Sequence, residues 1–444
     1  MNTNISESLE SPVSSFSPPK LLDSCSRKFD KKITILLLFI YASLELGNGA
    51  ISISFLVDSL LNYPSNDTLK SISAVLASVL LIVPFLILLV HSEPKWYVSA
   101  MIFLYGIFSI FYTIFEPSTA QDVMMFLSTI TYTLLYYGGI LYLSFWFPSS
   151  KLYTRIILVF LVSYIFRCFN EIVDIADLDL DTGYEYTPIL LIYNYVGASV
   201  VIIVSIVSIF LLKGYPENFK FLTEDEKKNA IEVLSAERGL ISDVKGRALQ
   251  IFKGFRNKNV YIKSLIYALM GISSIVLNNY YTQIILNEIT NNEDVFNSTD
   301  YRLYYASLLS LSASYVFGAI LLFFTKSIKR INVGLTIMFG FAILFSIVTV
   351  LISKLSKQYV AVFVAGLIMN IFNSAIQIHI FALLFAFTNN PSTRIFSMPA
   401  FLLSVSILNL IFGGIFRLAK SDVFNLVLGI MIMPITAAFT YYTQ

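Results

Sequence analysis

Ionisable side chains stand within segments of this chain that are otherwise apolar. Glu45 lies in the middle of one apolar run, and Arg167 and Glu171 lie deep in another. An ionised group at the centre of a bilayer costs about 2.5 to 3.5 kcal/mol, so such residues face water or a partner and commonly serve a function. We predict that Glu45 takes up and releases a proton. The alternative is a carboxyl group that stays neutral and hydrogen-bonded between helices.

Arg167 and Glu171 are four residues apart, a spacing that puts two side chains on one face of a helix. They are therefore predicted to pair within their segment. The pair has two interpretations: a structural ion pair, or an anion-binding arginine beside a carboxyl group that takes part in proton coupling. The second has a chemical basis, because a planar guanidinium makes two parallel hydrogen bonds to a carboxylate.

Amide side chains gather in two further apolar segments. Asn278, Asn279 and Tyr281 belong to one polar run, while Asn373 and Gln377 share a helix face in the other. Lipid cannot satisfy an amide, so these side chains are expected to point toward protein or water. We predict that they bind a solute. Hydrogen bonding between helices, worth about 0.6 kcal/mol per contact, is the alternative.

Aromatic residues offer a second kind of contact. Tyr132 and Tyr136 are four residues apart and are expected either to stack on a flat solute or to pack in the core. His379 is predicted to be a hydrogen-bonded packing residue rather than a titrating switch.

Long helices are needed to position all these residues. The 444-residue chain is 57% hydrophobic and 13% charged, against roughly 25% charged in soluble domains. About 20 apolar helical residues cross a bilayer. This criterion predicts an all-α membrane protein with twelve transmembrane helices, at about 33–57, 71–91, 96–115, 122–147, 153–174, 189–212, 264–287, 301–325, 333–353, 358–387, 395–416 and 422–442.

The distribution of basic residues predicts the orientation. With the amino terminus inside, 23 of the 30 Lys and Arg residues fall on the cytosolic side and six on the other. Basic residues collect in cytoplasmic loops, so both termini are expected in the cytosol. Two glycosylation sequons, at Asn66 and Asn297, then lie outside. Outward sequons indicate passage through the secretory pathway. We expect a multi-pass protein of the plasma membrane, with an internal membrane as the alternative.

One long connection divides the spans six and six. We predict a disordered cytosolic tail at 1–32, an N-terminal six-helix bundle at 33–212, a cytosolic linker at 213–263 and a C-terminal six-helix bundle at 264–444. Within the linker, Thr223 and Glu226 have the spacing of a capping box, which predicts a helix from about 224 to 238. Residues further along the linker are expected to form a second helix on the inner leaflet, or a plain solvated tether.

Several strings along the chain resemble one transporter family. They are KGYPENFKFLTEDEKKNAIEVLSAERG from Lys213, RKFDKKITILLLFIY from Arg27, YLSFWFPSS from Tyr142, Asn389-Asn390 with Arg394, and Asn409 ahead of Gly413-Gly414. In order and spacing these resemble the anion:cation symporters of the major facilitator superfamily, which include permeases for allantoate, nicotinate, pantothenate and biotin. The resemblance implies the major facilitator fold, in which spans 1, 4, 7 and 10 line a central site.

The chain departs from that family at several charged positions. Where the family has Asp-Arg in span 1, this chain has Gly47-Asn48, and the family's span 4 charges are replaced by residues such as Met124 and Tyr132. The resemblance places Asn48 in the solute site. It also implies an organic anion, such as a vitamin, a ureide or a related carboxylate, as the solute.

We therefore expect a secondary active transporter that moves a small organic solute by alternating access, coupled to protons and functional as a monomer in the lipid bilayer. A non-transporting solute sensor of the same fold is the alternative. An enzyme is not expected, because the two histidines are far apart and no metal-ligand spacing or nucleotide loop is present. No cofactor, metal ion or nucleic-acid partner is predicted.

Overall fold

The computed structural model describes most of both predicted helical bundles. The described residues are 27–47, 92–115, 119–178, 188–216, 222–238, 257–271, 273, 298–325, 331–355, 359–386, 395–396, 400, 404 and 407. Every secondary-structure element in these ranges is helical. The predicted spans at 71–91 and 422–442, most of the spans at 264–287 and 395–416, and residues 48–57 of the first predicted span lie outside them.

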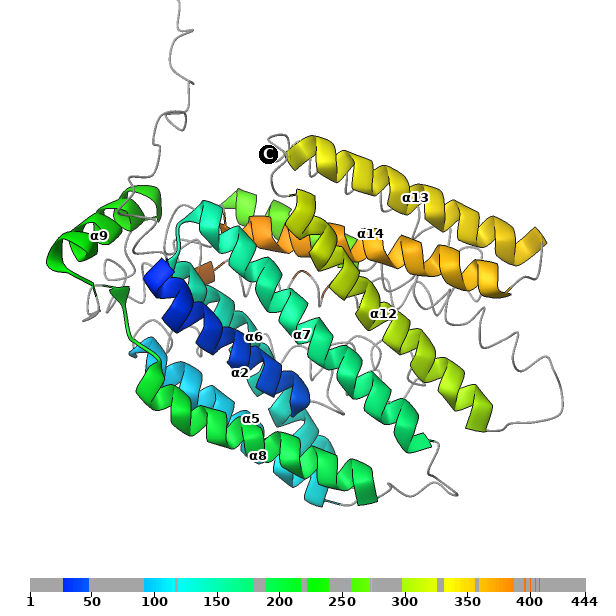
Figure 1. Ribbon diagram of the computed structural model, residues 1–444, viewed down its shortest axis with the longest axis horizontal. Helices are drawn as coiled ribbons and strands as arrows, with labels where there is room; N and C mark the ends of the chain where they lie inside the picture. Colours follow the sequence, from blue (N-terminus) through cyan, green and yellow to red (C-terminus); the bar gives the residue numbers. More distant parts are fainter. Residues whose placement is uncertain are drawn as a thin grey trace, which may run out of the picture.

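The described residues of the first half form five helices of twelve or more residues (Figure 1). They are α2 (Ile35–Leu46), α5 (Pro94–Ile114), α6 (Thr119–Trp146), α7 (Ser149–Leu178) and α8 (Pro188–Leu211). A π-helical turn, η1 (Asp30–Thr34), leads into α2. Helices α5 and α8 lie side by side, and α2 packs against both α7 and α8. Residues 27–34 are already helical, so this helix begins several residues before the predicted start of the first span.

In the second half, the described residues form a helical segment at 258–271 and three long helices. These are α12 (Ser298–Thr325), α13 (Ile331–Leu355) and α14 (Tyr359–Ala386). Helix α14 packs against α13 and α12, and α12 lies along α7 of the first half (Figure 1). The α7–α12 contact therefore joins the two halves.

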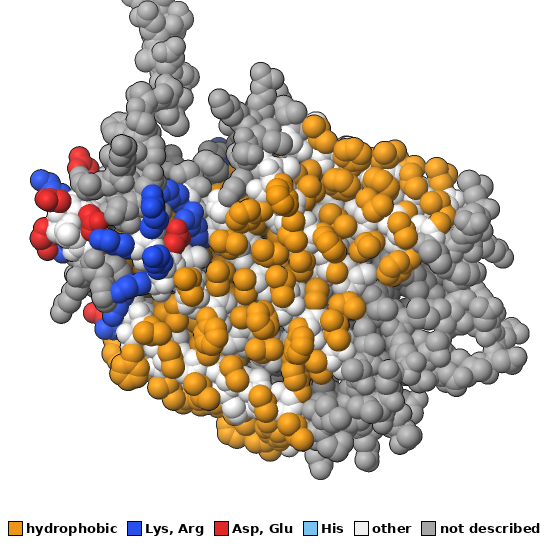
Figure 2. Space-filling model, viewed as in Figure 1, with side chains coloured by type: hydrophobic (Ala, Val, Ile, Leu, Met, Phe, Trp, Pro, Cys, Tyr) orange, Lys and Arg blue, Asp and Glu red, His pale blue; other side chains and the backbone are white. Residues whose placement is uncertain are grey.

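Within the part of the chain that the structure describes, five helices are long and apolar enough to cross a membrane. They are Pro94–Ile114, Val123–Trp146, Lys151–Val173, Ile192–Leu211 and Ala361–Phe385. Large apolar side chains point outward along them and their neighbours, with Phe210 73% exposed and Phe324 78% exposed. Figure 2 shows a face covered by hydrophobic side chains, with charged residues gathered at the end near α9 (Glu224–Arg238). This pattern is that of a multi-pass membrane protein, because lipid replaces water around the apolar surface.

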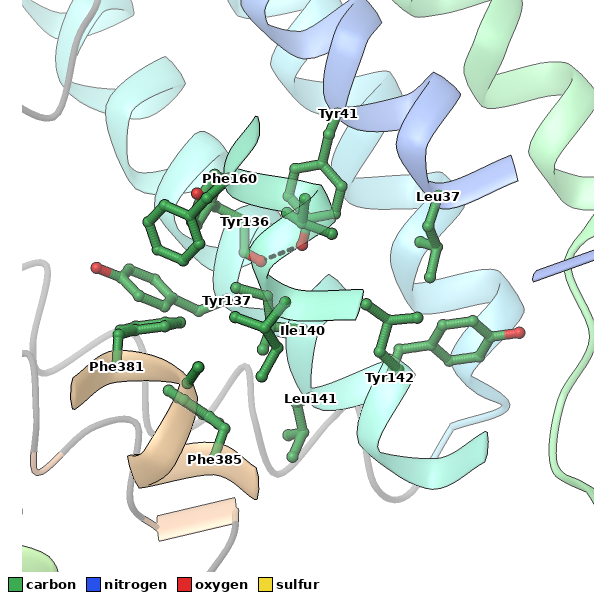
Figure 3. Packing of buried hydrophobic residues seen from close by; sticks show 14 of the residues in the cluster. Leu37, Tyr41, Tyr136, Tyr137, Ile140, Leu141, Tyr142, Phe160, Phe381 and Phe385 are labelled. Carbon is green, nitrogen blue, oxygen red and sulfur yellow. Dashed lines mark hydrogen bonds between the residues drawn. The ribbon is translucent and has the colours of Figure 1, made fainter. Parts of the chain in front are cut away.

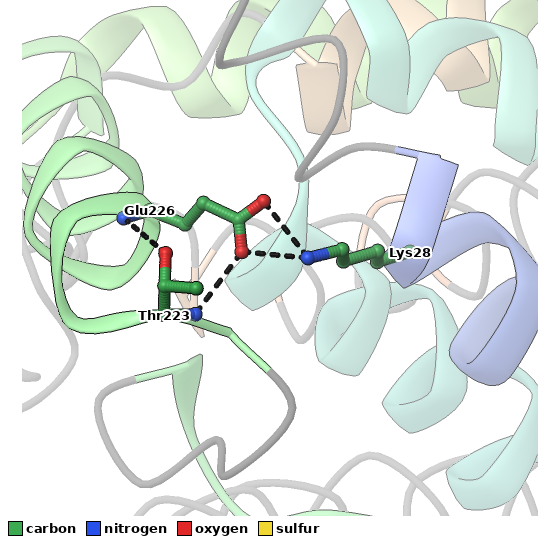
Figure 4. A network of polar contacts seen from close by, with 3 residues as sticks. All are labelled: Lys28, Thr223 and Glu226. Atoms are coloured by element: carbon green, nitrogen blue, oxygen red, sulfur yellow. Dashed lines mark hydrogen bonds and ion pairs between the residues drawn. The ribbon is translucent and has the colours of Figure 1, made fainter.

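The predicted capping box is confirmed at the start of α9. The Thr223 hydroxyl accepts a hydrogen bond from the Glu226 amide at 3.3 Å, and Glu226 Oε2 accepts one from the Thr223 amide at 3.1 Å. Lys28 Nζ donates to both oxygens of the same carboxylate, at 2.8 and 2.7 Å (Figure 4). The linker helix is thereby tied to the segment that leads into the first span.

A second ionic contact braces the same end of the molecule. Arg155 on α7 makes a two-pronged ion pair with Asp30, with one Nε to Oδ1 distance of 2.9 Å. Its guanidinium also lies over the Phe147 ring, 5.0 Å from the centroid. Because Phe29 packs edge-on against Trp146 and Phe147, the helix start before α2 is held by both charge and aromatic contact. These contacts explain why the helix begins earlier than hydropathy alone predicts.

Two glycines of α6, Gly138 and Gly139, allow side chains of α5 and α2 to approach its backbone closely. A Cβ atom at Gly138 would lie 3.1 Å from the Tyr97 ring, and one at Gly139 would collide with the Tyr41 hydroxyl. The Tyr41 hydroxyl can therefore reach α6 and donate to the backbone oxygen of Tyr136.

Candidate functional site

Glu45 lies near the end of α2 and is 4% exposed. Its Oε1 accepts a hydrogen bond from the Tyr132 hydroxyl of α6 at 2.5 Å. Its backbone oxygen accepts a second one from Asn170 Nδ2 of α7 at 2.6 Å, and the Tyr193 hydroxyl of α8 donates to Asn170 Oδ1. Glu45 thus links α2 to α6 through its carboxyl group and to α7 through its backbone oxygen, and Asn170 extends the network to α8.

Tyrosine rings surround that carboxyl group. Tyr132 stacks on Tyr136, with centroids 5.9 Å apart at 23°, and tilts toward Tyr105 at 5.8 Å. Tyr136 also packs edge-on against Tyr41. All four rings are buried. In this structure Tyr132 and Tyr136 are core residues, and the Tyr132 hydroxyl is the polar atom that they bring to Glu45.

Arg167 and Glu171 pair as their spacing predicts. The Arg167 Nε lies 3.5 Å from Glu171 Oε1, with side chains 20% and 10% exposed. Ser312 Oγ of α12 donates to the same carboxyl oxygen at 3.5 Å, so the pair contacts the second half of the molecule. Arg167 also interacts electrostatically with Glu45. We call Glu45, Tyr132, Arg167 and Glu171 the central cluster.

Stacked tyrosines join the two halves next to the central cluster. Tyr164 of α7 and Tyr315 of α12 have centroids 4.2 Å apart at 7°. The Tyr315 hydroxyl donates to Gln377 Oε1 of α14, and Gln377 Nε2 donates to the Met270 backbone oxygen at 3.5 Å. Gln377 is therefore close to the interface between the halves, and its amide is hydrogen-bonded within the protein.

The neighbouring amide differs from Gln377. Asn373, one turn earlier on α14, is 1% exposed, and neither its Oδ1 nor its Nδ2 has a hydrogen-bond partner within the described part of the chain. A buried amide without partners is costly, and such groups are rare in folded proteins. Asn373 is therefore an expected contact for a bound polar molecule.

A second contact between the halves lies closer to the end of the molecule that carries α9. The Tyr153 hydroxyl of α7 and His379 Nδ1 of α14 are hydrogen-bonded at 2.5 Å. Beside them the Phe381 ring packs against Tyr137 at 5.8 Å and against Phe160 at 5.2 Å (Figure 3). His379 is thus a hydrogen-bonded, buried residue, as the sequence predicts.

The described residues bring together part of the predicted site. Glu45 and Tyr132 meet directly, and Arg167, which pairs with Glu171, interacts electrostatically with Glu45. Gln377 reaches the same region through the Tyr164–Tyr315 contact. Six predicted residues lie outside the described ranges: Asn48, Asn66, Asn278, Asn279, Tyr281 and Asn297. Their roles stay predictions.

Sequence reasoning missed several contributors to the site. Tyr105, Tyr164, Tyr315 and Ser312 join it through tertiary contacts, and no local spacing marks them among the 27 tyrosines and many serines of the chain. The described residues contain no group of three or more His, Cys, Asp or Glu side chains that could hold a metal ion.

Comparison with known proteins gives matches in structure but not in sequence. No protein-family model matches the chain, and no curated protein matches it. The E. coli fucose:proton symporter FucP, as a variant, matches with a TM-score of 0.62 at 12% identity, over 93% of this chain and 98% of that one. FucP in its outward conformation matches with a TM-score of 0.64 at 12% identity and the same coverage. The proton:xylose symporter XylE, bound to 6-bromo-6-deoxy-D-glucose, matches with a TM-score of 0.62 at 11% identity, over 94% and 96% of the two chains.

These matches cover nearly the whole chain, so they define the class of fold. The protein is an all-α membrane protein with the major facilitator fold, as the sequence predicts. The finer resemblance to anion:cation symporters is not tested by these matches and stays a prediction.

Proposed function

We propose that the protein is a secondary active transporter that moves a small organic solute across a membrane by alternating access. The observation that carries the proposal is the central cluster, in which ionisable groups lie between helices at the junction of two halves of the major facilitator fold. Intramembrane charges of this kind usually mark a solute or proton pathway. The similar solved structures include proton symporters for fucose and xylose, which agrees with this class of activity.

Glu45 is the proposed proton carrier. Its carboxyl group accepts a hydrogen bond from Tyr132 and lies within electrostatic reach of Arg167. When Glu45 is ionised, both neighbours stabilise its charge. When Glu45 is protonated, Arg167 interacts with the charge of Glu171 alone. Uptake of one proton therefore changes the charge balance at the junction of the halves, which is what coupling to solute binding requires.

The contacts between the halves support a rocking motion. In this structure Tyr153 with His379, and Phe381 with Phe160, join α7 and α14 near the α9 end. Alternating access requires such contacts to form in one state and break in the other. We infer that they belong to a gate on the α9 side of the site.

The proposed orientation in the membrane rests on the distribution of Lys and Arg residues. The Lys and Arg residues near α9 in Figure 2 favour that end as cytosolic, with both termini inside. We infer a plasma-membrane protein that acts as a monomer, with the bundles at 33–212 and 264–444 joined by the linker at 213–263. A solute sensor of the same fold remains the competing hypothesis. It would bind a solute without moving it.

Uptake into cells that express the full chain tests the proposal. The labelled panel contains nicotinate, pantothenate, biotin, allantoate, small peptides, D-xylose and L-fucose, at pH 5 and pH 7.5. We expect acid-stimulated uptake of one compound. Glu45→Gln should abolish the stimulation, and Glu232→Gln, at an exposed position on α9, should not. Binding of a panel compound without uptake, by a chain shown to be at the surface, would instead establish the sensor.

A further inference from the structure

The charges within the membrane-spanning part leave no unpaired cation for an anionic solute. Of the 30 Lys and Arg residues, Arg167 alone lies away from the ends of the predicted spans. Its Nε is 3.5 Å from Glu171 Oε1, and Glu45 also acts on it. The guanidinium thus pairs with one carboxyl group and lies within electrostatic range of a second. The set carries a charge of −1 when both are ionised and 0 when one is protonated.

An anion entering this site would lose its hydration without gaining a free positive charge. Burial of an ionised group is unfavourable unless the group is paired and hydrogen-bonded. An anion that paired with Arg167 would compete with Glu171 and Glu45 for the same guanidinium and would add a further negative charge to the set. A neutral solute avoids both costs, because it leaves the Arg167–Glu171 pair intact.

The amide of Asn373 indicates what a neutral solute would contact. Asn373 lies at the depth of the ion pair, because its neighbour Ser374 approaches Ser314 of α12 at 3.3 Å, and Ser312, two residues earlier on α12, contacts Glu171. It also shares a helix face with Gln377. Among the described residues, Asn373 is the buried amide whose donor and acceptor are both without a partner. Hydroxyl and amide groups both donate and accept, so they match it.

We propose that the site takes an uncharged solute rich in hydroxyl or amide groups, and that Asn373 hydrogen-bonds to it. This inference rests on the proposed transport function and narrows its substrate class. It replaces the organic anion expected from the sequence resemblance with a neutral molecule such as a sugar, a polyol or an amide.

Matched pairs of compounds that differ mainly in one charge provide the test. The pairs are D-glucose and D-gluconate, nicotinamide and nicotinate, and pantothenol and pantothenate. Each is offered in labelled form to liposomes that contain the purified full chain. We expect the neutral member of at least one pair to be taken up at least tenfold faster than its anionic partner.

Asn373→Leu tests the assigned contact. With the transported neutral compound, we expect KM to rise at least tenfold while kcat changes less than threefold. The unliganded variant should melt no lower than the wild type, since the substitution removes a buried amide that has no partner. Asn259→Ala, at an exposed position outside both bundle cores, should leave KM unchanged.

The outcomes separate failure of the inference from failure of the proposed function. Uptake of an anionic member as fast as its neutral partner would overturn the inference and leave transport established. An unchanged KM in Asn373→Leu would overturn the assigned contact. Uptake of none of the six compounds, nor of D-xylose or L-fucose, by correctly folded protein would count against transport and against the inference with it.

Discussion

The Arg167–Glu171 pair yields a prediction whose magnitude follows from the structure. Arg167→Gln leaves Glu171, whose side chain is 10% exposed, without its cation. At the observed 3.5 Å the attraction is about 5 kcal/mol for an effective dielectric constant of about 20. Breaking a buried pair by removing one partner typically costs about 3 to 5 kcal/mol. We expect Arg167→Gln to lower the free energy of unfolding by about 3 to 5 kcal/mol. The loss is at the lower end of this range if a carboxyl group takes up a proton, because a neutral carboxyl group needs no cation.

The double variant Arg167→Gln with Glu171→Gln distinguishes a pair from two independent residues. Removing both charges leaves two amides that can hydrogen-bond to each other and to Ser312. The unfolding free energy should therefore return to within about 1 kcal/mol of the wild type. Equilibrium unfolding of the purified protein in mixed SDS and detergent micelles, followed by circular dichroism, measures all three values.

An exposed ion pair serves as the matched control. Lys95 Nζ lies 2.9 Å from Glu93 Oε2, with side chains 30% and 46% exposed. Exposed pairs contribute about 0 to 1 kcal/mol, so Lys95→Gln should have little effect. Two results would refute the argument that Glu171 pairs with Arg167. One is a loss of unfolding free energy in Arg167→Gln no larger than in Lys95→Gln. The other is a double variant no more stable than Arg167→Gln.

Two further predictions concern the end of the molecule near α9. Thr223→Val should remove the helix cap, at a cost of about 1 kcal/mol, and raise amide hydrogen exchange in the first turn of α9 about fivefold; unchanged exchange would contradict the cap. Tyr153→Phe removes the hydrogen bond to His379, which is worth about 1 kcal/mol. The fraction of molecules in which the two halves are separated at the α9 end should therefore rise about fivefold. Spin labels at Lys31 and Phe324, both exposed, measure that population, and an unaltered distance distribution would contradict a gate at this contact.

The transmembrane helices were predictable because hydropathy acts locally. The five apolar spans of the described part coincide with predicted spans to within a few residues. Contacts within one turn or one cap were predictable for the same reason, as the Thr223–Glu226 capping box and the Arg167–Glu171 pair show. In each case the deciding residues are three or four positions apart.

The partners of the key residues were not predictable, because they are distant in sequence. Tyr132 lies 87 residues from Glu45, and His379 lies 226 residues from Tyr153. Hydropathy marks a polar residue as facing inward but does not say what it meets there. Asn373 and Gln377 have similar sequence contexts, yet only Gln377 is paired within the described structure.

The resemblance in sequence and the arrangement of charge lead to different expectations for the solute. Sequence strings resemble those of anion:cation symporters and favour a carboxylate. The single intramembrane arginine, once paired with Glu171, favours a neutral molecule. The difference arises because a count of charges does not show which of them are already neutralised.

Proton-driven uptake by the purified protein tests the central claim most directly. Full-length protein in liposomes is exposed to the labelled panel with the outside at pH 5 and the inside at pH 7.5, and then with pH 7.5 on both sides. We predict that one compound accumulates above its external concentration only while the proton gradient lasts, and that Glu45→Gln removes this accumulation. Equal uptake with and without the gradient, or accumulation that persists in Glu45→Gln, would contradict proton-coupled transport through this site.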